Sequence, residues 1–197
     1  MIVKQNIENN HEYVDLGLSV KWATCNVGAS SPEEYGDYFA WGETEPKDIY
    51  NFDTYKWYQL NNETKRFMID KYNDKDNKMI LDSEDDVAHV KWGGSWHIPT
   101  YNEWIELTTK CTFEVETING VSGYNVTSKI NGNKIFLPFS GSKQYDCVQY
   151  KDKYGSYWIN KAYYEPDYSE SFDFNKSIIE IYMTPRYTGL SVRPVCE

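Results

Sequence analysis

The chain has 197 residues, 40% of them hydrophobic and 25% charged, which suits one folded domain and excludes a chain that is disordered by composition. Its net charge of -10 excludes nucleic acid as a partner, because phosphates select basic surfaces, and it argues equally against an anionic membrane surface. No apolar run of about 18 residues is present to insert into a membrane, and residues 1–17 lack the apolar stretch of a signal peptide.

Aromatic residues make up 17% of the chain, with 18 Tyr and 7 Trp. Tyr and Trp give large contact areas with few rotatable bonds and carry a polar group, so this excess suits a recognition surface. The same residues are common on the half-buried faces of small sheets. Binding and packing therefore both explain the excess.

The first part of the chain predicts short elements. We expect residues 1–11 to be flexible and residues 12–28 to hold the opening strands, because β-branched and apolar residues there are punctuated by glycine. Residues 30–36 predict a short helix with Ser31 as its N-cap, and residues 37–43 predict a short aromatic strand.

The middle of the chain predicts a long loop and then a helix. Residues 44–82 are polar and rich in Asn, Asp, Lys and Tyr, which is typical of a surface excursion, with one short helix expected near residues 63–72. The strongest helix is predicted over residues 100–110. There Thr100 and Glu103 form a capping box, in which each side chain can bond the backbone N–H of the other.

The last part predicts a series of short strands. Residues 123–139 form two alternating runs around Asn131-Gly132, a pair typical of a two-residue type I′ hairpin turn. Further strands are expected at residues 156–160, 171–174, 178–183 and 190–195. The order of elements predicts one α+β domain over residues 1–197, with short antiparallel strands, about two helices and long loops.

No catalytic constellation is recognisable in the sequence. There is no glycine-rich phosphate loop, and no nucleophile motif surrounds the cysteines. The three histidines are scattered and no Cys-x-x-Cys pair occurs, so a zinc site is not expected. The four cysteines permit three full disulfide pairings, and isolated buried thiols fit them equally well. We therefore expect a protein without enzymatic activity.

One acidic cluster suggests a metal site. Four carboxylates lie close together in the sequence, at Asp82, Glu84, Asp85 and Asp86. Clustered carboxylates suit calcium, although the glycine and the closing glutamate of an EF-hand loop are missing. The favoured interpretation is that Asp82 or Ser83 caps a short helix, whose N-terminal dipole the acids stabilise. No cofactor is expected beyond this candidate calcium ion.

Several segments together resemble one protein family. They are YVDLGLSVKWATCNVGASSPEEYGDYFAWGETEPK, EDDVAHVKWGGSWHIPTYNEWIEL, GYNVTSKINGNKIFLPFSG, GSYWIN and GLSVRPVC, and they cover most of residues 12–196. This pattern resembles the Fibrobacter succinogenes major paralogous domain, a large family in gut Bacteroidetes and Fibrobacter. The resemblance implies a C-type-lectin-like fold, related to formylglycine-generating enzymes and to the variable proteins of diversity-generating retroelements.

The resemblance also implies particular contacts. In this fold the first and last strands lie together, so Cys25 and Cys196 are expected near each other. The tryptophans belong to the scaffold, and Arg193 on a late strand is expected to pair with a buried carboxylate. Formylglycine-generating activity needs a pair of active-site cysteines. Only Cys147 and Cys196 occur late in this chain, in no matching motif, so that activity is not implied, and a divergent oxidase using one of these thiols is left as an alternative.

The segment after residue 142 departs from the usual family pattern and is rich in tyrosine. In the retroelement-diversified relatives the corresponding segment is a binding face, which the resemblance implies for this chain as well. The candidate ligand-binding residues are Tyr145, Tyr150, Tyr157, Asn160, Tyr163, Tyr164, Tyr168 and Tyr187. A half-exposed structural sheet is the other interpretation of the same pattern.

Members of the family are mostly surface or secreted proteins. The resemblance therefore implies an extracellular or cell-surface module, displayed on a bacterium or on a phage particle, that binds a glycan or protein ligand. The alternative is a structural or assembly subunit, such as a fimbrial or tail-tip adhesin component.

Overall fold

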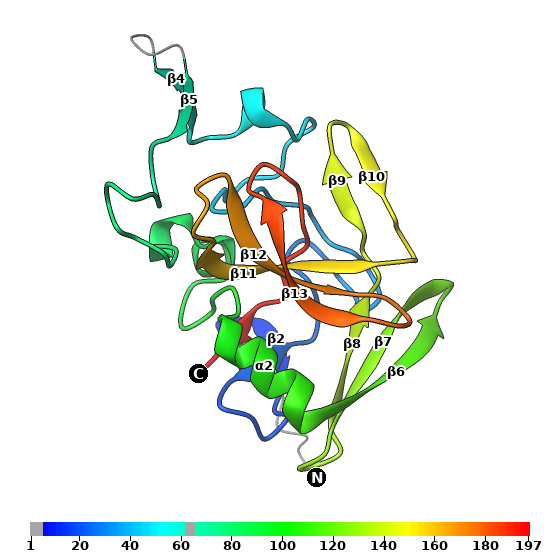
Figure 1. Ribbon diagram of the computed structural model, residues 1–197. Coiled ribbons are helices and arrows are strands. Elements are labelled where there is room, and N and C mark those ends of the chain that lie inside the picture. The colour runs from blue at the N-terminus through cyan, green and yellow to red at the C-terminus, as the bar shows by residue number, and fades with distance from the viewer. Residues whose placement is uncertain (1–5, 62–65) are drawn as a thin grey trace.

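The computed structural model describes residues 6–61 and 66–197, in which mostly antiparallel strands and two α-helices surround a hydrophobic core (Figure 1). This mixture confirms the predicted α+β class. All seven tryptophans are buried: Trp22, Trp41, Trp57, Trp92, Trp96, Trp104 and Trp158. Core packing therefore accounts for the whole of the tryptophan excess. Among the described residues, no helix has the length and apolar character needed to cross a membrane.

The last strand of the described chain lies in the same sheet as the opening strands, as the resemblance implied, and it pairs with the third of them. They belong to an antiparallel sheet of order β1-β2-β3-β14. Its strands are β1 (Ile7–Glu8), β2 (His11–Val14), β3 (Lys21–Ala23) and β14 (Val195–Cys196). Trp22 lies opposite Val195. Part of residues 1–11 is therefore paired rather than flexible. All four cysteines are free thiols, so Cys25 and Cys196 form no bridge.

Arg193 does not pair with a carboxylate, which corrects the sequence expectation. Its fully buried guanidinium donates to Asn26 Oδ1 at 2.8 Å and to the carbonyl oxygens of Ala23 and Thr24 at 3.1 and 2.8 Å. These neutral acceptors lie on β3 and just after it. Arg193 thus ties the end of the described chain to its first sheet by hydrogen bonds to a buried charge.

Helix α2 (Tyr101–Lys110) confirms the helix predicted over residues 100–110. Its capping box is present, because the Thr100 hydroxyl accepts from the Glu103 N–H at 3.2 Å and the Glu103 carboxylate accepts from the Thr100 N–H at 2.6 Å. Trp104 on this helix is fully buried. Local capping and one apolar face are enough to specify this element.

The predicted hairpin over residues 123–139 is present, but the prediction of a two-residue type I′ turn at Asn131-Gly132 is wrong. It belongs to a sheet of order β6-β7-β8, with strands β6 (Cys111–Ile118), β7 (Val121–Ser128) and β8 (Lys134–Pro138). The β7–β8 loop is longer than two residues, and the Asn131 side chain is occupied by a hydrogen bond to the Asp15 carbonyl at 3.0 Å. The two-residue turn joins β6 and β7 instead, where Asn119 and Gly120 have φ angles of 50° and 86°.

A central antiparallel sheet of order β11-β12-β13 carries the strands predicted at residues 156–160, 171–174 and 178–183, whereas of the strand predicted at residues 190–195 only Val195 belongs to a strand, β14. Its strands are β11 (Gly155–Ala162), β12 (Tyr168–Phe174) and β13 (Ile179–Pro185). Phe172 and Phe174 point from β12 into the core cluster around Trp104. Asp173 lies between them in the chain and points to the other face, because successive strand side chains alternate.

Part of segment 44–82 belongs to the core, so its prediction as a surface excursion is wrong for those residues. The buried side chains are Tyr50, Tyr55, Trp57, Ile69, Tyr72 and Leu81. The segment contains the 3₁₀ helix η1 (Phe52–Thr54) and the hairpin strands β4 (Tyr58–Asn61) and β5 (Arg66–Ile69). A strand thus replaces the helix expected near residues 63–72, and residues 62–65 lie outside the described residues. The sequence did not predict this burial because polar residues separate the aromatic ones and no regular apolar pattern results.

Arg186 holds this segment against the central sheet. Its buried guanidinium lies 4.8 Å from the centroid of the Trp41 ring. Its Nε donates to the Tyr168 carbonyl and its Nη1 to the Tyr72 carbonyl, each at 3.0 Å. One side chain after β13 therefore binds backbone from two distant parts of the chain.

Two other short predictions are wrong. Residues 30–36 form turns rather than a helix, because the Glu34 carboxylate accepts from the Ser30 N–H at 2.7 Å and closes the segment on itself. Residues 37–43 contribute one β-bridge, between Phe39 and Leu190, rather than a strand. The remaining elements are η2 (Ser83–Asp85), α1 (Val87–Trp92), β9 (Ser142–Gln144) and β10 (Cys147–Gln149).

Candidate functional site

The tyrosine-rich segment does not form one continuous face. Tyr145, Tyr150 and Tyr164 are strongly exposed, at 64%, 61% and 67%. Tyr163, Tyr168 and Tyr187 are partly exposed, whereas Tyr157 and Asn160 are buried. The structure therefore divides the eight candidate residues into surface and interior groups.

The surface group is itself divided. Tyr163 and Tyr164 contact each other at the turn between β11 and β12, with ring centroids 4.3 Å apart and the ring planes tilted by 42°. Tyr187 packs instead on Phe52, also at 4.3 Å. Tyr145 lies at the turn between β9 and β10, in the hairpin drawn in yellow at the upper right of Figure 1. Tyr163, Tyr164 and Tyr187 follow strand ends that lie together, because Ala162 pairs with Ser169 and Tyr168 with Pro185, whereas Tyr150 precedes the start of β11 at the opposite end of the central sheet.

The two buried candidates serve the interior. The Tyr157 hydroxyl donates to the Pro138 carbonyl at 2.8 Å, and its ring belongs to the core. Asn160 lines a separate hollow of about 280 Å³ beside Asp86 and His97, where its Oδ1 has no hydrogen-bond partner among the described residues. Neither side chain contributes to an exposed tyrosine face.

Two adjoining hollows lie beside the exposed Tyr150, and we call them together the tyrosine groove. The first, of about 310 Å³, is lined by Gly141, Ser142, Tyr150, Tyr154, Ser156 and Asp173. The second, of about 270 Å³, is lined by Tyr154, Asp173, Phe174, Asn175, Ile178, Glu180 and Tyr182. Tyr154 and Asp173 belong to both, so the hollows meet at these two side chains.

The register of the central sheet explains the floor of the groove. Ser156 on β11 is opposite Asp173 on β12, and Asp173 is opposite Glu180 on β13. A directly opposed row of this kind places three polar side chains on one face, about 5 Å apart. The face turned away from the aromatic core therefore carries a hydroxyl and two carboxylates in a line.

Asp173 is the unusual member of this row. Its Oδ1 is buried and has no hydrogen-bond partner among the residues that the structure describes. Burial raises the pKa of Asp173 to about 6, and the Glu180 carboxylate adds to the rise, while the hydroxyls of Ser171 and Ser156 oppose it. Nearby like charges with no cation between them are costly, and a bound group can remove that cost.

The rim of the groove is held in an uncommon backbone conformation. Tyr150 and Asp152 have φ angles of 57° and 61°, a region that bulky side chains rarely adopt. The Asp152 N–H donates to the Phe139 carbonyl at 2.8 Å, and its carboxylate accepts from the Tyr35 hydroxyl at 2.6 Å. The loop is thus fixed by contacts outside itself, with Tyr150 and Tyr154 presented 5.8 Å apart.

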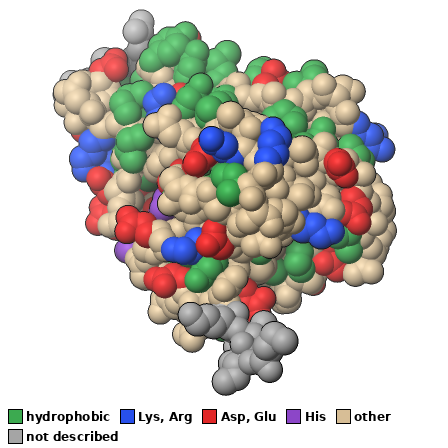
Figure 2. All heavy atoms as spheres, turned by 90° about the horizontal axis from the view of Figure 1, so that it is seen from below, with side chains coloured by type: hydrophobic (Ala, Val, Ile, Leu, Met, Phe, Trp, Pro, Cys, Tyr) green, Lys and Arg blue, Asp and Glu red, His purple; other side chains and the backbone are tan. Residues whose placement is uncertain are grey.

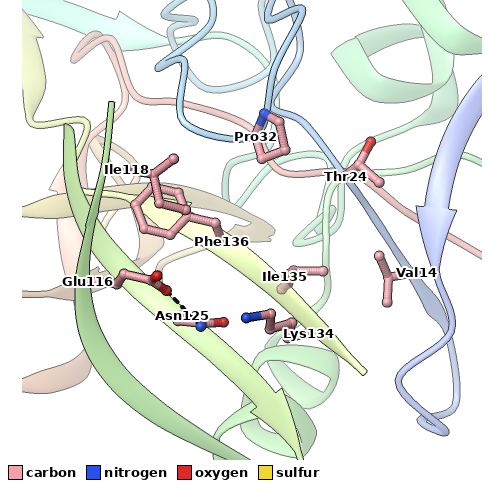
Figure 3. A pocket seen from close by; sticks show the side chains of 9 residues that line it. All are labelled: Val14, Thr24, Pro32, Glu116, Ile118, Asn125, Lys134, Ile135 and Phe136. Atoms are coloured by element: carbon pink, nitrogen blue, oxygen red, sulfur yellow. Dashed lines mark hydrogen bonds between the residues drawn. The ribbon is translucent and has the colours of Figure 1, made fainter. Parts of the chain in front are cut away.

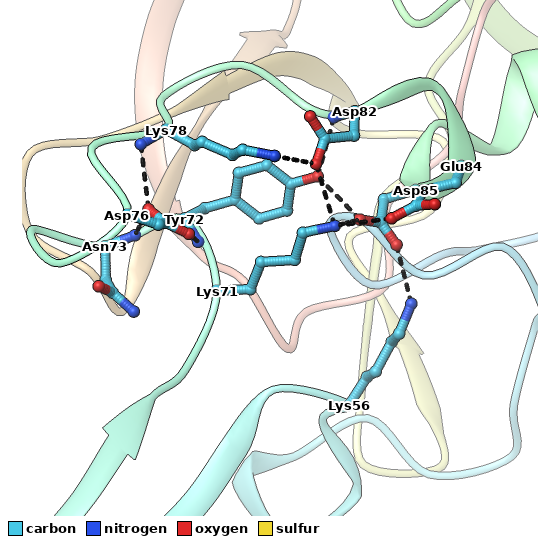
Figure 4. A network of polar contacts seen from close by, with 9 residues as sticks. All are labelled: Lys56, Lys71, Tyr72, Asn73, Asp76, Lys78, Asp82, Glu84 and Asp85. Atoms are coloured by element: carbon cyan, nitrogen blue, oxygen red, sulfur yellow. Dashed lines mark hydrogen bonds and ion pairs between the residues drawn. The ribbon is translucent and has the colours of Figure 1, made fainter.

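The acidic cluster predicted as a calcium site is already neutralised by lysines (Figure 4). Three of its four carboxylates meet, those of Asp82, Glu84 and Asp85. Lys71 Nζ lies among all three, 3.1 Å from both Asp82 and Glu84 and in direct contact with Asp85. Lys56 Nζ contacts Asp85 at 2.8 Å. A lysine ammonium therefore supplies the positive charge that a metal ion would bring.

Asp86 has a different role from its neighbours. Its carboxylate is buried and accepts from the N–H groups of Ala88 and His89 at 2.9 and 3.2 Å, which caps α1, and from Ile98 N–H at 2.8 Å. The helix cap proposed from the sequence thus exists, but Asp86 provides it, and Asp82 makes no side-chain cap bond.

A fourth hollow, of about 210 Å³, lies between the β6–β8 sheet and the N-terminal segment (Figure 3). Val14, Ile135 and Phe136 line it together with polar side chains. Its Glu116 carboxylate accepts from the Asn125 amide at 2.7 Å, so this acid has a partner, unlike Asp173.

The thiols are poorly suited to nucleophilic chemistry. Burial raises the pKa of Cys111 and of Cys196 to about 11. The hydrogen bond from Cys147 to Asp146 raises the pKa of that exposed thiol as well. A nucleophilic cysteine needs a lowered pKa, and none of these three has one.

Comparisons with known proteins give no further guidance: no family model, no curated protein and no solved structure matches the chain. The groove residues Asp173, Glu180 and Tyr182 were missed in the sequence. The one signal for Asp173 was a carboxylate between two phenylalanines in a predicted strand, which indicates a polar side chain on the face opposite a core.

Proposed function

We propose that this protein is a non-catalytic binding module that holds a glycan in the tyrosine groove. The observation that carries the proposal is the combination of exposed tyrosine rings with a buried, unpartnered carboxylate oxygen at the meeting point of two hollows. Tyrosine rings offer apolar faces for sugar rings, and a few fixed polar groups set orientation, as is usual in ligand sites.

The family resemblance and the pairing of the last strand, β14, with β3 in the N-terminal sheet support a C-type-lectin-like fold for this module. The same resemblance supports display at a bacterial cell surface or on a phage particle. The raised pKa values of Cys111, Cys147 and Cys196 support a role without thiol catalysis. Acidic and basic side chains are interspersed on the face seen in Figure 2, as on an ordinary solvated surface.

A glycan array with the intact chain tests the proposal. Selective binding is expected, and the double substitution Tyr150→Ala with Tyr154→Ala should weaken it at least about tenfold, because stacked aromatic anchors dominate such sites. Tyr164→Ala is the matched control, since Tyr164 is equally exposed but lies beyond β11 at the other end of the sheet. A silent array, or equal losses in both variants, would contradict the proposal and favour a protein partner or an assembly role.

A further inference from the structure

We infer that the tyrosine groove selects saccharides without negative charge, and that Asp173 is the residue that determines this specificity by accepting a hydrogen bond from a ligand hydroxyl or ammonium group. The inference rests on the proposed function and adds a ligand class to it. It comes from the charges that line the groove and from a buried carboxylate oxygen there, Asp173 Oδ1, that lacks a partner among the described residues.

The described residues that line the groove include two carboxylates and no Lys, Arg or His. Asp173 and Glu180 are direct cross-strand neighbours, so their charges reinforce each other at one point of the floor. A carboxylated sugar placed there would bring a third negative charge into a site without a compensating cation. Like charges at such close range repel one another in a partly desolvated site, so we expect acidic glycans to bind more weakly than neutral ones.

Asp173 Oδ1 also defines what the ligand must offer. An ionised carboxylate oxygen only accepts hydrogen bonds, and this one has no donor among the described residues. The Ser171 and Ser156 hydroxyls lie near enough to Asp173 to favour its ionised form, but neither makes a hydrogen bond to Oδ1, and the Ser171 hydroxyl lies 2.8 Å from the Thr184 hydroxyl. A ligand O–H or N–H directed at Oδ1 would satisfy it, and charged acceptors give the stronger class of hydrogen bond.

Two other acidic side chains of the molecule, unlike Asp173, have hydrogen-bond partners within the protein. Asp85 is bonded by Lys56, Lys71 and Tyr72, and Asp86 by three backbone N–H groups. Asp173 has a buried oxygen without any such partner, and that oxygen lies beside exposed aromatic rings. Among these three acids, Asp173 is the one with binding capacity left for a ligand.

The test compares oligomers of N-acetylglucosamine (neutral), glucosamine (cationic) and galacturonic acid (anionic), all of the same length. The glycans selected on the array are measured alongside them. Binding is expected for neutral or cationic glycans and not for anionic ones. Asp173→Asn should weaken that binding roughly tenfold, the loss of one charged hydrogen bond. A preference for glucosamine would identify an ammonium as the donor, and equal binding would identify a hydroxyl.

Glu180→Gln is the companion variant, because it removes charge from the same row without removing the buried acceptor. It should reduce the affinity for glucosamine more than the affinity for neutral glycans, because the lost charge attracts the ammonium group but not a neutral sugar. Thermal denaturation of both variants establishes that each is folded. If Tyr150→Ala with Tyr154→Ala abolishes glycan binding while Asp173→Asn leaves it unchanged, the inference is overturned and the proposed function stands. Preferential binding of galacturonate oligomers would also overturn the inference and leave the proposed function standing. If the unmodified chain binds no glycan on the array, the proposed function itself is overturned.

Discussion

The acidic cluster at residues 82–85 and the Asp173–Glu180 pair are two groups of carboxylates with opposite surroundings. The first is dense in the sequence, and lysines from other segments compensate its charge. The second is invisible in the sequence because its members are separated along the chain, and no cation lies among the described residues lining its groove. The density of acidic residues in a sequence therefore does not show which carboxylates keep hydrogen-bonding capacity for a ligand, because that depends on the partners that the fold brings to each of them.

The largest effect that tests this comparison is expected at Asp85. Asp85→Asn should lower the free energy of unfolding by about 3 kcal/mol at pH 7, because the loss of a buried acid leaves Lys71 and Lys56 without their main partner. Urea denaturation measures the change. Glu84→Gln is the matched control, since Glu84 is 76% exposed and should cost less than about 0.5 kcal/mol. Equal losses in the two variants would remove the distinction between them.

At Asp173 we expect the opposite effect, an increase in the free energy of unfolding when the carboxylate is removed. Its pKa is raised from 3.8 to about 6 by burial and by Glu180, so its unfavourable charge destabilises the folded state at neutral pH. Stability from this group is fully present below about pH 4 and is lost as the pH rises through 6. Asp173→Asn should therefore raise the free energy of unfolding at pH 7 by about 2 kcal/mol and have little effect at pH 4. A destabilised variant at pH 7 would show that the carboxylate is compensated.

A third test concerns acid unfolding. The pKa of Asp85 is lowered, because hydrogen bonds from Lys56, Lys71 and Tyr72 outweigh the upward effect of its burial. Its stabilising contribution is present above about pH 4 and is lost as the pH falls through the lowered pKa. Asp85→Asn should flatten the loss of stability below pH 4. If the variant loses stability below pH 4 as steeply as the unmodified chain, a carboxylate other than Asp85 causes the acid unfolding.

A smaller effect is expected for the exposed rings. Tyr150→Ala should change the free energy of unfolding by less than about 0.5 kcal/mol, as is usual for exposed side chains, even though it weakens ligand binding. The positive φ of Tyr150 makes Tyr150→Gly informative, because glycine adopts that conformation readily. Differential scanning calorimetry separates these contributions from the binding loss.

The smallest effect is expected from calcium. Millimolar Ca²⁺ should shift the melting temperature by less than about 1 °C, because Lys71 already occupies the centre of the acidic cluster. A shift of several degrees that EDTA reverses and Asp85→Asn abolishes would instead establish a metal site there.

The elements that could be predicted from the sequence depend on local interactions, whereas those that could not depend on contacts between residues far apart in the chain. Helix α2 was predicted because its capping box and apolar face are both local. The burial of Tyr50, Trp57 and Tyr72 was not, because these rings are interleaved with charged residues and depend on distant partners. The type I′ turn was assigned to Asn131, whose side chain is engaged by Asp15, more than a hundred residues away.

The candidate site shows the same limit. The tyrosine-rich segment includes the exposed Tyr150, but an alternating strand also sends tyrosines such as Tyr157 inward. Asp173 and Glu180 meet only through the register of β12 and β13, which the sequence pattern left open. Pairing across strands thus decided which polar residues came together.

The bonds of Arg186 have a consequence for how the molecule unfolds. Because one guanidinium holds backbone of both segment 44–82 and β12, that segment cannot detach without stranding a buried charge. We therefore expect amide hydrogens of Trp57 and of the central sheet to exchange with solvent in the same cooperative event. Most of the contacts that create this event join residues far apart in the chain, so the protein should fold slowly, on the timescale of milliseconds to seconds.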